Sequence, residues 1–415
     1  MSEVLALESA PSAVQTQRLQ RQLQATKRRY IRRSVLLILP LLALLVLGFL
    51  TPIGALLSKS VENPEVAETL PKTLVQLKNW DGQALPGESA FSALGEDLRS
   101  ARSNGQLFAF NRRLGYESSH LSSLSGSVLT RLPASGKPVR EALLNSVPAL
   151  ADIKTWSTLK HLGQPYTDFY WLAAFDLKKD AGHISAVAPD KALYVDVLKR
   201  SLLIAALVTV LCVLLGYPLA YWLSRQPARR ANLLLILVLL PFWTSLIVRT
   251  ASWIVLLQSG GLINNTLIDL GILEKPLQLV FNRTGVLISM THILLPFLIL
   301  PLYAVMKGID SRFERAAISL GAHPFTAFRR VYLPQTYAGV TAGALLVFIM
   351  AIGYYITPAL LGGPGDQMIS YFVAYYTNTT INWGMATALG TQLLIIVLLL
   401  YWVYAKVSRP ANRPA

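Results

Sequence analysis

The sequence is short of charged residues and contains a single cysteine. Asp, Glu, Lys and Arg make up 14% of its 415 residues, against about 25% in a typical soluble domain. So few charges could not cover the surface of a soluble globule of this size. The lone Cys212 cannot form an intrachain disulfide, and apolar residues, at 53%, are too abundant for a disordered chain. These absences point to an integral membrane protein.

Six runs of mostly apolar residues are present instead. Each is long enough to cross a hydrocarbon core of about 30 Å as a helix. They predict an all-α integral membrane protein with six transmembrane helices, at Ser34 to Leu57, Leu202 to Leu223, Ala231 to Leu257, Thr284 to Val305, Ala338 to Leu361 and Gly384 to Tyr404. The first run is longer than the apolar part of a secretory signal peptide, so we expect it to stay as an anchor.

The distribution of Lys and Arg predicts the orientation in the bilayer. If the N-terminus is cytoplasmic, the four inner segments carry 18 basic residues, while the two short outer loops carry only Lys275 and Arg283. Because positive loops are retained inside, both termini are expected in the cytoplasm. We therefore interpret the excess of positive charge as a topology signal in a protein that contacts the lipid bilayer. It does not indicate a nucleic-acid partner.

A long segment separates the first two predicted spans. The predicted organisation is a basic cytoplasmic tail at 1–33, a transmembrane helix at 34–57, an extracytoplasmic insert at 58–200, a five-helix core at 201–405 and a cytoplasmic tail at 406–415. Apolar residues in the insert recur at helical spacing, as in Phe91, Leu94 and Leu98, so a mostly helical insert is expected. Two interpretations stay open for it: a packed unit without a ligand of its own, or a docking surface for a soluble partner.

The inner loop at residues 306–335 is long for a connection between spans. Ser311 and Glu314 have the spacing of a capping box, which predicts a helix starting just after Ser311. Gly321 can adopt the left-handed conformation that ends this helix.

A second short helix is expected in the same loop. Pro324 suits its first turn, and Pro334 is predicted to stop it before the fifth span. Phe325, Phe328 and Val331 form an apolar stripe at three-residue spacing. Two helices this short cannot bury such a stripe alone, so it must meet a partner or the ends of the chain's own spans.

These residues resemble a known family. The string Arg315-Ala-Ala-Ile-Ser-Leu-Gly321, nine further residues and Val331-Tyr-Leu-Pro334 match the EAA loop of binding-protein-dependent ABC importer permeases. The resemblance implies a type I ABC importer permease-like fold in which this loop couples to a cytoplasmic ATPase. It implies the coupling residues Glu314, Arg315, Ala316, Ala317, Gly321, Val331, Leu333 and Pro334. Because Arg315 stands at the family's Glu position, Glu314 could be either a helix cap or a docking residue.

Further strings in residues 190–405 look like the spermidine/putrescine-type permeases, among them Pro241-Phe-Trp-Thr-Ser245 and Leu361-Gly-Gly-Pro-Gly365. Residues of about 60 to 165 lie outside this likeness. The resemblance implies a polyamine cargo, a bacterial inner-membrane location and three protein partners. These partners are a cytoplasmic ABC ATPase dimer, a second permease subunit that is a paralogue, and a periplasmic solute-binding protein.

The spans lack the groups that would let the chain drive transport itself. No Asp or Glu lies inside the six predicted spans, which disfavours a carrier coupled to protons or sodium. The phosphate-binding pattern Gly-x-x-x-x-Gly-Lys-Ser/Thr is missing from the sequence, so the chain is not expected to hydrolyse ATP. We therefore expect no catalytic residue, no metal site and no cofactor of its own, with ATP bound by the partner subunit.

Arg249 is the one charge inside a predicted span. It could snorkel or make a structural contact, or it could act in gating. The other candidates for lining a path are Trp243, Thr244, Ser245, Tyr354 and Tyr355, although such residues also serve as helix contacts. A lone His292 is more typical of a hydrogen-bonded core residue than of a ligand. A different class of function, a membrane-anchored receptor or scaffold with an outer ligand-binding domain, remains the alternative.

Overall fold

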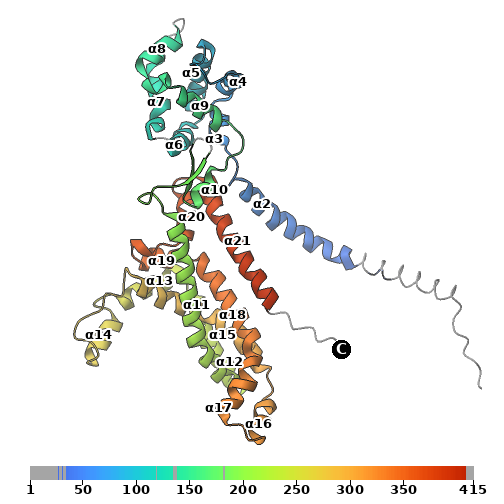
Figure 1. Ribbon diagram of the computed structural model, residues 1–415. Helices are drawn as coiled ribbons and strands as arrows, with labels where there is room; N and C mark the ends of the chain where they lie inside the picture. Colours follow the sequence, from blue (N-terminus) through green and yellow to red (C-terminus); the bar gives the residue numbers. More distant parts are fainter. Residues whose placement is uncertain are drawn as a thin grey trace, which may run out of the picture. The chain divides into compact units, whose positions relative to one another are not determined.

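The protein is described by a computed structural model, which covers Lys27, Tyr30 and residues 34–117, 119–133, 138–180 and 183–407. Helices dominate these residues (Figure 1). Six helical segments are long and apolar enough to cross a membrane: Ser34–Ser58, Tyr194–Ser224, Leu246–Asp269, Arg283–Lys307, Pro324–Gly353 and Trp383–Lys406. The chain separates into two compact units, one ending at Ser58 and one beginning at Lys59. The predicted number of spans is confirmed.

The first unit contains the first candidate span. A π-helical turn, Val46–Leu50, interrupts the α-helix, which continues as α2 (Thr51–Ser58). None of the residues in its apolar window is buried within the protein. Side chains such as Leu37 and Leu47 are exposed, as expected for a helix that faces lipid or a partner subunit. Its bounds agree with the predicted span to within one residue.

The insert between the first two spans is mostly helical, as the sequence predicts. Its helices are α3 (Pro64–Thr69), α4 (Pro71–Leu77), α5 (Glu88–Ser103), α6 (Leu107–Glu117), α7 (Leu124–Arg131), α8 (Val139–Ser146), α9 (Ile153–Leu162) and α10 (Phe169–Ala174), with 3₁₀ turns at Ser119–Ser123 and Pro148–Ala151. One antiparallel hairpin follows, made of β1 (Leu177–Asp180) and β2 (His183–Ala186). Its location outside the cytoplasm stays a prediction.

The insert has an apolar core of its own, and the predicted helical spacing fills it. Phe91, Leu94 and Leu98 lie on one face of α5 and are fully buried. The ring of Trp156 on α9 meets Phe91 at 4.6 Å between centroids, and its indole Nε1 donates to the Leu150 carbonyl at 2.9 Å. A buried carboxylate, Asp97, accepts from the first turn of α4. The insert therefore packs in the manner of a soluble helical domain.

The rest of the chain forms a bundle of long helices joined by shorter ones. The helices are α11 (Tyr194–Ser224), α12 (Ala228–Leu239), α13 (Leu246–Leu257), α14 (Leu262–Asp269), α15 (Arg283–Lys307), α16 (Arg312–Ser319), α17 (Pro324–Ala327), α18 (Leu333–Gly353), α19 (Ile356–Leu361), α20 (Ile369–Asn378) and α21 (Trp383–Val407). Short 3₁₀ turns lie at Leu240–Trp243 and Pro364–Asp366, and a π-helical turn at Phe328–Tyr332.

Small residues bring α11, α15 and α18 together at the centre of this bundle. A Cβ added to Gly343 on α18 would lie 3.1 Å from the carbonyl oxygen of Leu298 on α15. A Cβ on Gly216 of α11 would lie 2.6 Å from the Leu298 side chain. Such close backbone approach is typical of helices packed within a membrane.

Two predicted spans have different bounds in the structure. The third, predicted as one helix, is interrupted after Leu239, and the candidate span of sufficient length and apolarity starts at Leu246. Pro241 lies at this interruption, where its missing N–H and its ring disfavour a continuous helix. The fifth, predicted to start at Ala338 and end at Leu361, starts earlier and ends at Gly353. A run of apolar residues does not reveal such breaks.

The insert continues into the bundle through a capped helix start. Asp176, which precedes the hairpin and has a positive φ of 54°, aims its carboxylate at the first turn of α11. It accepts from the backbone N–H groups of Leu193, Tyr194 and Val195 at 2.8 to 3.0 Å. These donors would otherwise lack partners at the helix N-terminus. The hairpin is thereby fixed to the start of the second span.

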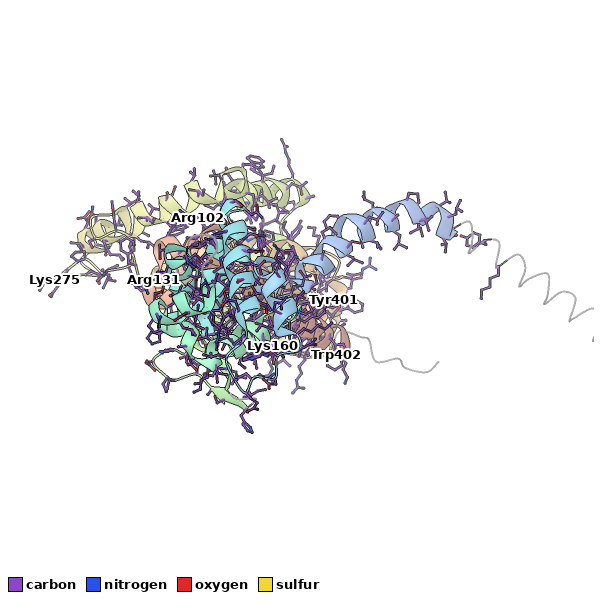
Figure 2. All side chains as sticks on the ribbon, turned by 90° about the horizontal axis from the view of Figure 1, so that it is seen from above. Arg102, Arg131, Lys160, Lys275, Tyr401 and Trp402 are labelled. Atoms are coloured by element: carbon purple, nitrogen blue, oxygen red, sulfur yellow. The ribbon has the colours of Figure 1, made fainter. Side chains whose placement is uncertain are left out.

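The last span carries aromatic residues near its end. Tyr401 and Trp402 lie at the side of the bundle, with more than half of each side chain exposed (Figure 2). The ammonium of Lys406 lies 5.2 Å from the centroid of the Trp402 ring. Exposed aromatic residues next to a basic residue at a helix end are typical of the membrane–water interface.

Candidate functional site

The predicted coupling loop begins with α16. The helix starts at Arg312, as the sequence predicts, but the predicted capping box is wrong. Ser311 already has helical backbone angles and its side chain caps no backbone N–H. The carboxylate of Asp310 accepts from the Arg312 N–H at 2.8 Å, and Arg315 Nη2 donates to Ser311 Oγ at 3.2 Å. Asp310 therefore takes the capping role because its side chain reaches the first free donor.

Gly321 ends α16 in the conformation that the sequence predicts. Its φ is +90°, in the left-handed region that residues with a Cβ rarely adopt. Its N–H donates to the Ile318 carbonyl at 2.9 Å. Pro324 then opens α17, also as predicted. The turn between the two short helices is therefore determined by local residue chemistry.

Pro334 does not end the second helix, and the expectation that it would is wrong. The segment from Pro324 runs without a break into the fifth span, through the π-helical turn Phe328–Tyr332. The N–H of Leu333 bonds to the Phe328 carbonyl within that turn. A π turn widens the helix by one residue, which makes room for a proline ring at the start of α18.

The two short helices expose apolar side chains. Phe313, Ile318, Leu320 and Phe325 are 57%, 41%, 90% and 65% exposed. Ala316 is exposed and Ala317 is half-buried, so another surface could approach the α16 backbone. The predicted stripe divides: Phe325 stays exposed, while Phe328 packs on the chain's own rings. This apolar surface is of the kind that marks a protein contact.

A basic residue that sequence reasoning missed fixes this loop to the spans. Arg225, just after α11, forms an ion pair with Glu314 of α16. Its guanidinium carbon lies 4.7 Å from the Tyr221 ring centroid and 5.4 Å from that of Tyr332, and Phe328 packs at 5.4 Å against Tyr221. Glu314 is thus a link to α11, a role that neither sequence interpretation included. In the sequence, Arg225 counted only as one more positive charge of an inner loop.

Three of the predicted path residues lie at the interruption before α13. Trp243 closes the 3₁₀ turn and is 77% exposed. Thr244 and Ser245 follow, and Ser245 Oγ accepts from the Val248 N–H at 3.2 Å as the cap of α13. A broken helix within a span leaves backbone groups available, and such breaks line cavities in transporters.

Arg249 lies one turn into α13 and folds back onto this interruption. Its Nη2 donates to the Thr244 carbonyl at 2.8 Å, and its guanidinium carbon lies 5.6 Å from the Phe242 ring centroid. Its Nε is buried and has no hydrogen-bond partner among the described residues. Arg249 therefore makes a structural contact, as one of the two interpretations predicts, and its role in gating stays a prediction.

The second break lies at Tyr354 and Tyr355, between α18 and α19. Tyr354 leaves the helical conformation at the end of α18. Tyr355 is 39% exposed. A path role for these residues remains a prediction.

Two polar residues near the breaks serve as helix contacts. Thr357 Oγ1 lies 3.1 Å from Thr250 Oγ1, and both residues are fully buried between α13 and α19. His292 accepts from Trp253 Nε1 at 3.3 Å. His292 is thus hydrogen-bonded, as expected, but it is exposed within this chain, so the expectation of a core residue is wrong.

Comparison with known proteins places the chain in a family. Residues 212–411 match the model of the binding-protein-dependent transport system inner membrane component family. This region includes the coupling loop and both breaks, and it leaves out the insert.

Curated relatives agree with this match. The spermidine/putrescine transport system permease protein PotB of Haemophilus influenzae is 37% identical over 221 residues, which cover 53% of this chain and 77% of that protein. PotB of Escherichia coli is 34% identical, covering 53% and 80%. The inner membrane ABC transporter permease protein YdcU of E. coli is 31% identical, covering 51% and 71%.

A solved bacterial ABC transporter involved in the import of alginate covers 52% of this chain and 80% of its own, at 17% identity and a TM-score of 0.43. That likeness is too slight to bear on the cargo.

The sequence relatives decide against the receptor or scaffold alternative. The chain belongs to the binding-protein-dependent transport system inner membrane components, as a multi-pass permease subunit of the spermidine/putrescine-type ABC importers that is not itself an enzyme.

Proposed function

We propose that the chain passes a polyamine, such as spermidine or putrescine, from a periplasmic binding protein to the cytoplasm, using ATP that a separate ATPase subunit binds. The cargo rests on the relatives, because PotB of two organisms is named for spermidine and putrescine transport. The energy source rests on the exposed coupling loop. The termini would lie in the cytoplasm, on the same side as that loop.

The observation that carries the proposal is the link between α16 and α11. Phe313, Ile318 and Leu320 offer an apolar surface to an ATPase, while Glu314 on the same helix is paired with Arg225 at the end of the second span. A displacement of α16 would therefore be transmitted to α11. An ATPase dimer that closes on ATP would shift the bundle between two states by this route. A second permease, most simply a paralogue, would complete the path.

Aromatic residues at the two breaks support a cationic cargo. Trp243 and Tyr355 are exposed at the interruptions of the third and fifth spans, where their rings could hold an ammonium group by cation–π attraction of about 0.5–2 kcal/mol. The path would then bind weakly, and the binding protein would supply specificity. Weak binding suits a transporter, because the cargo must be released after it is bound.

Arg249 favours a second class of cargo. A fixed positive charge beside the break repels a polyamine, whereas the unpartnered, buried Nε of Arg249 could donate to a carboxylate. A carboxylate-bearing solute is therefore the second candidate. The two candidates differ in the sign of the charge that Arg249 meets.

The experiment is uptake by proteoliposomes that contain this chain with the ATPase, second permease and binding protein encoded beside it. We expect ATP-dependent uptake of spermidine. Gly321→Val should abolish it, because a valine side chain strains the left-handed turn. Gly308→Val, at an ordinary backbone angle, should retain it. Uptake of a carboxylate solute alone would replace the polyamine with the second candidate. Failure of an ATPase to associate at all would contradict the proposed energy source.

A separate pair of variants tests the proposed role of Trp243 in the path. Trp243→Leu should reduce spermidine uptake several-fold, while Trp222→Leu, which alters an exposed tryptophan near the end of α11 away from the breaks, should leave it unchanged. Equal uptake by both variants would remove Trp243 from the path.

A further inference from the structure

The turn between α20 and α21 has an unfavourable backbone conformation. Ile381 in this turn has a φ of +52°, which is an outlier for a β-branched residue because the Cβ then crowds the neighbouring carbonyl oxygen. A residue in such a conformation persists only where the surrounding structure holds it. The next residue bonds back to α20, since the Asn382 N–H donates to the Tyr376 carbonyl at 2.8 Å. Further contacts with this turn come from the insert.

Helix α6 of the insert bonds to the turn on both sides of Ile381. The Arg112 guanidinium donates to the carbonyl of Thr380, the residue before it. The Tyr116 hydroxyl, one turn further along α6, accepts from Asn382 Nδ2 at 2.7 Å. Asn382 is 1% exposed, and its Oδ1 caps the first turn of α21. The conformation of the turn and the start of the last span are therefore tied to α6.

Helix α10 of the insert packs directly on the start of α21. The Tyr170 ring is 1% exposed and lies against Gly384, where an added Cβ would be 2.3 Å from the ring. The Tyr170 hydroxyl donates to Glu65 Oε1 of α3 at 3.1 Å. Ala174 of α10 and Leu389 of α21 belong to the same apolar cluster. Contact this close leaves α21 little freedom to shift against the insert.

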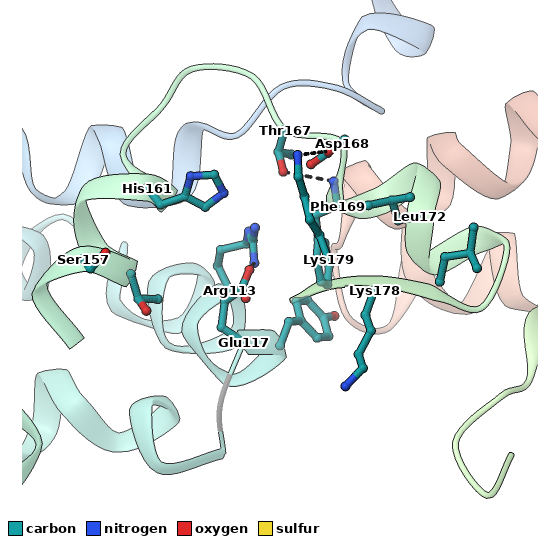
Figure 3. A pocket seen from close by; sticks show the side chains of 13 residues that line it. Arg113, Glu117, Ser157, His161, Thr167, Asp168, Phe169, Leu172, Lys178 and Lys179 are labelled. Atoms are coloured by element: carbon teal, nitrogen blue, oxygen red, sulfur yellow. Dashed lines mark hydrogen bonds and ion pairs between the residues drawn. The ribbon is translucent and has the colours of Figure 1, made fainter. Parts of the chain in front are cut away.

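A buried guanidinium connects α6 with α10. Arg113 is 1% exposed and lies between the two helices (Figure 3), with its central carbon 4.3 Å from the centroid of the Phe169 ring. Its Nη1 donates to Glu117 Oε1 at 3.1 Å and its Nε to Asn63 Oδ1 at 3.0 Å. The Phe169 ring also stacks on Tyr116 at 5.5 Å. The side chains that hold the turn are thus part of one buried network of the insert.

We propose that the insert positions the last span, with Arg112 and Tyr116 as positioning residues that hold the turn at Ile381 in place. The insert also caps α11 through Asp176, so it links the starts of α11 and α21 and makes these two spans move together. The family match begins at residue 212 and leaves out the insert. The consequence for transport rests on the function proposed above, whereas the positioning of α21 does not.

The experiment measures the distance between α11 and α21 by double electron–electron resonance, using the full chain in lipid nanodiscs. Spin labels are attached through Lys199→Cys and Ile395→Cys at exposed positions of the two helices, while the single native cysteine, Cys212, is buried. Arg112→Ala should widen the distance distribution by about twofold, because the turn then samples a second conformation. Arg102→Ala, which removes an exposed arginine of α5, should leave it unchanged.

A second substitution separates release of the turn from loss of the insert fold. Ile381→Asn introduces a residue that adopts a positive φ more readily than a β-branched one. It should restore the narrow distribution in the Arg112→Ala chain, because a relaxed turn no longer needs the bond to α6. An unfolded insert would not be repaired by this change. Tyr116→Phe, which removes only the hydroxyl, should widen the distribution less than Arg112→Ala does.

Uptake by proteoliposomes with the partner proteins provides the functional measurement. Arg112→Ala should lower the maximal rate several-fold and leave KM unchanged, because α21 is displaced while cargo recognition is not altered. The proposal is overturned by an unchanged distance distribution in Arg112→Ala, by equal widening in Arg102→Ala, or by no recovery with Ile381→Asn. The expected distance changes in a chain that transports no polyamine would uphold the positioning role and contradict only the proposed cargo.

Discussion

The insert and the membrane bundle are both built from helices, yet they pack in different ways. In the insert, large side chains such as Phe91 and Trp156 fill a core that water would otherwise surround. In the bundle, glycines such as Gly343 let backbones approach closely beside buried side chains such as Leu298, and many other large side chains are exposed. The hydrophobic effect drives the first arrangement. In lipid that force is missing between helices, so close van der Waals contact takes its place.

The two regions also treat polar groups differently. The insert buries whole charges in networks, as with Arg113, and the Asp97 carboxylate accepts from Thr73 N and Oγ1 at 2.8 Å. The bundle relies on hydroxyl pairs such as Thr250 with Thr357. A hydroxyl is far less costly to bury than a charge. Arg249, with its buried Nε, departs from this pattern, and so does Asp366, which is 8% exposed and pairs with Arg283.

The largest effect is expected when the core of the insert is emptied. Phe91→Ala should lower the free energy of unfolding of the insert by about 3–5 kcal/mol, because it leaves a cavity against Trp156. Pulse proteolysis of the full chain in detergent across a denaturant series would measure this loss. The control is Phe108→Ala, since Phe108 is 69% exposed. Equal losses in the two variants would mean that the insert does not pack as described.

The second largest effect is expected when a side chain is added where two helices of the bundle are in close contact. Gly343→Ile should destabilise the bundle by about 1–3 kcal/mol, because α18 must move away from the Leu298 backbone. Gly390→Ile is the matched variant, since no atom lies within 4 Å of a Cβ at Gly390. Unfolding in mixed detergent would report the difference. If Gly390→Ile were as costly as Gly343→Ile, close approach would not explain the packing.

The junction between the two regions is expected to show an intermediate effect. Asp176→Ala should cost about 1–2 kcal/mol, because three N–H groups at the start of α11 lose their acceptor. Asp152→Ala removes a single exposed cap bond, to Lys154 at 2.9 Å, and should cost less. Thermal unfolding of both variants provides the comparison. A larger loss in Asp152→Ala would show that α11 needs no cap.

The smallest effect is expected at the water-facing surface of the insert. The hydrogen bond from Lys179 lowers the pKa of Asp168 below its ordinary value. The contribution of this ion pair to the free energy of unfolding is therefore complete above the unfolded pKa of about 3.9. It is lost as the pH falls through the lower pKa of the folded state. Because about half of the carboxylate is exposed, Asp168→Asn should cost only a few tenths of a kcal/mol at neutral pH. The stability difference should disappear near pH 2, and a difference that persists there would have another cause.

Features set by one or two residues could be predicted from the sequence. Gly321 takes the positive φ, Pro324 opens α17, and Phe91 faces the core at its helical spacing. The capping box failed because Ser311 joins the helix backbone, and Asp310 caps the helix start through the Arg312 N–H. Pro334 misled because a π turn can absorb a proline ring. In both cases the residues are those of the expected motif, but neighbouring residues adopt a local structure that replaces it.

The candidate site was only partly predictable. The coupling loop is recognisable from its fixed spacing, but the pairing of Glu314 with Arg225 joins residues that are 89 positions apart. Thr250 and Thr357 come from two separate helices, so no local pattern could predict their contact. The contact of the insert with the start of α21 is equally nonlocal, since Arg112 and Thr380 are 268 positions apart.

Length and apolarity alone determined that the chain has six segments able to span a membrane, because burial in lipid demands long apolar helices whatever their neighbours. The helical spacing of apolar residues predicted the helical insert. The spacing of the inner loop determined the family. Only the tertiary structure decided where the third and fifth spans break, how Arg225 holds α16, and how the insert contacts the start of α21. These features depend on contacts between distant residues, whose free energy appears only once the chain has folded.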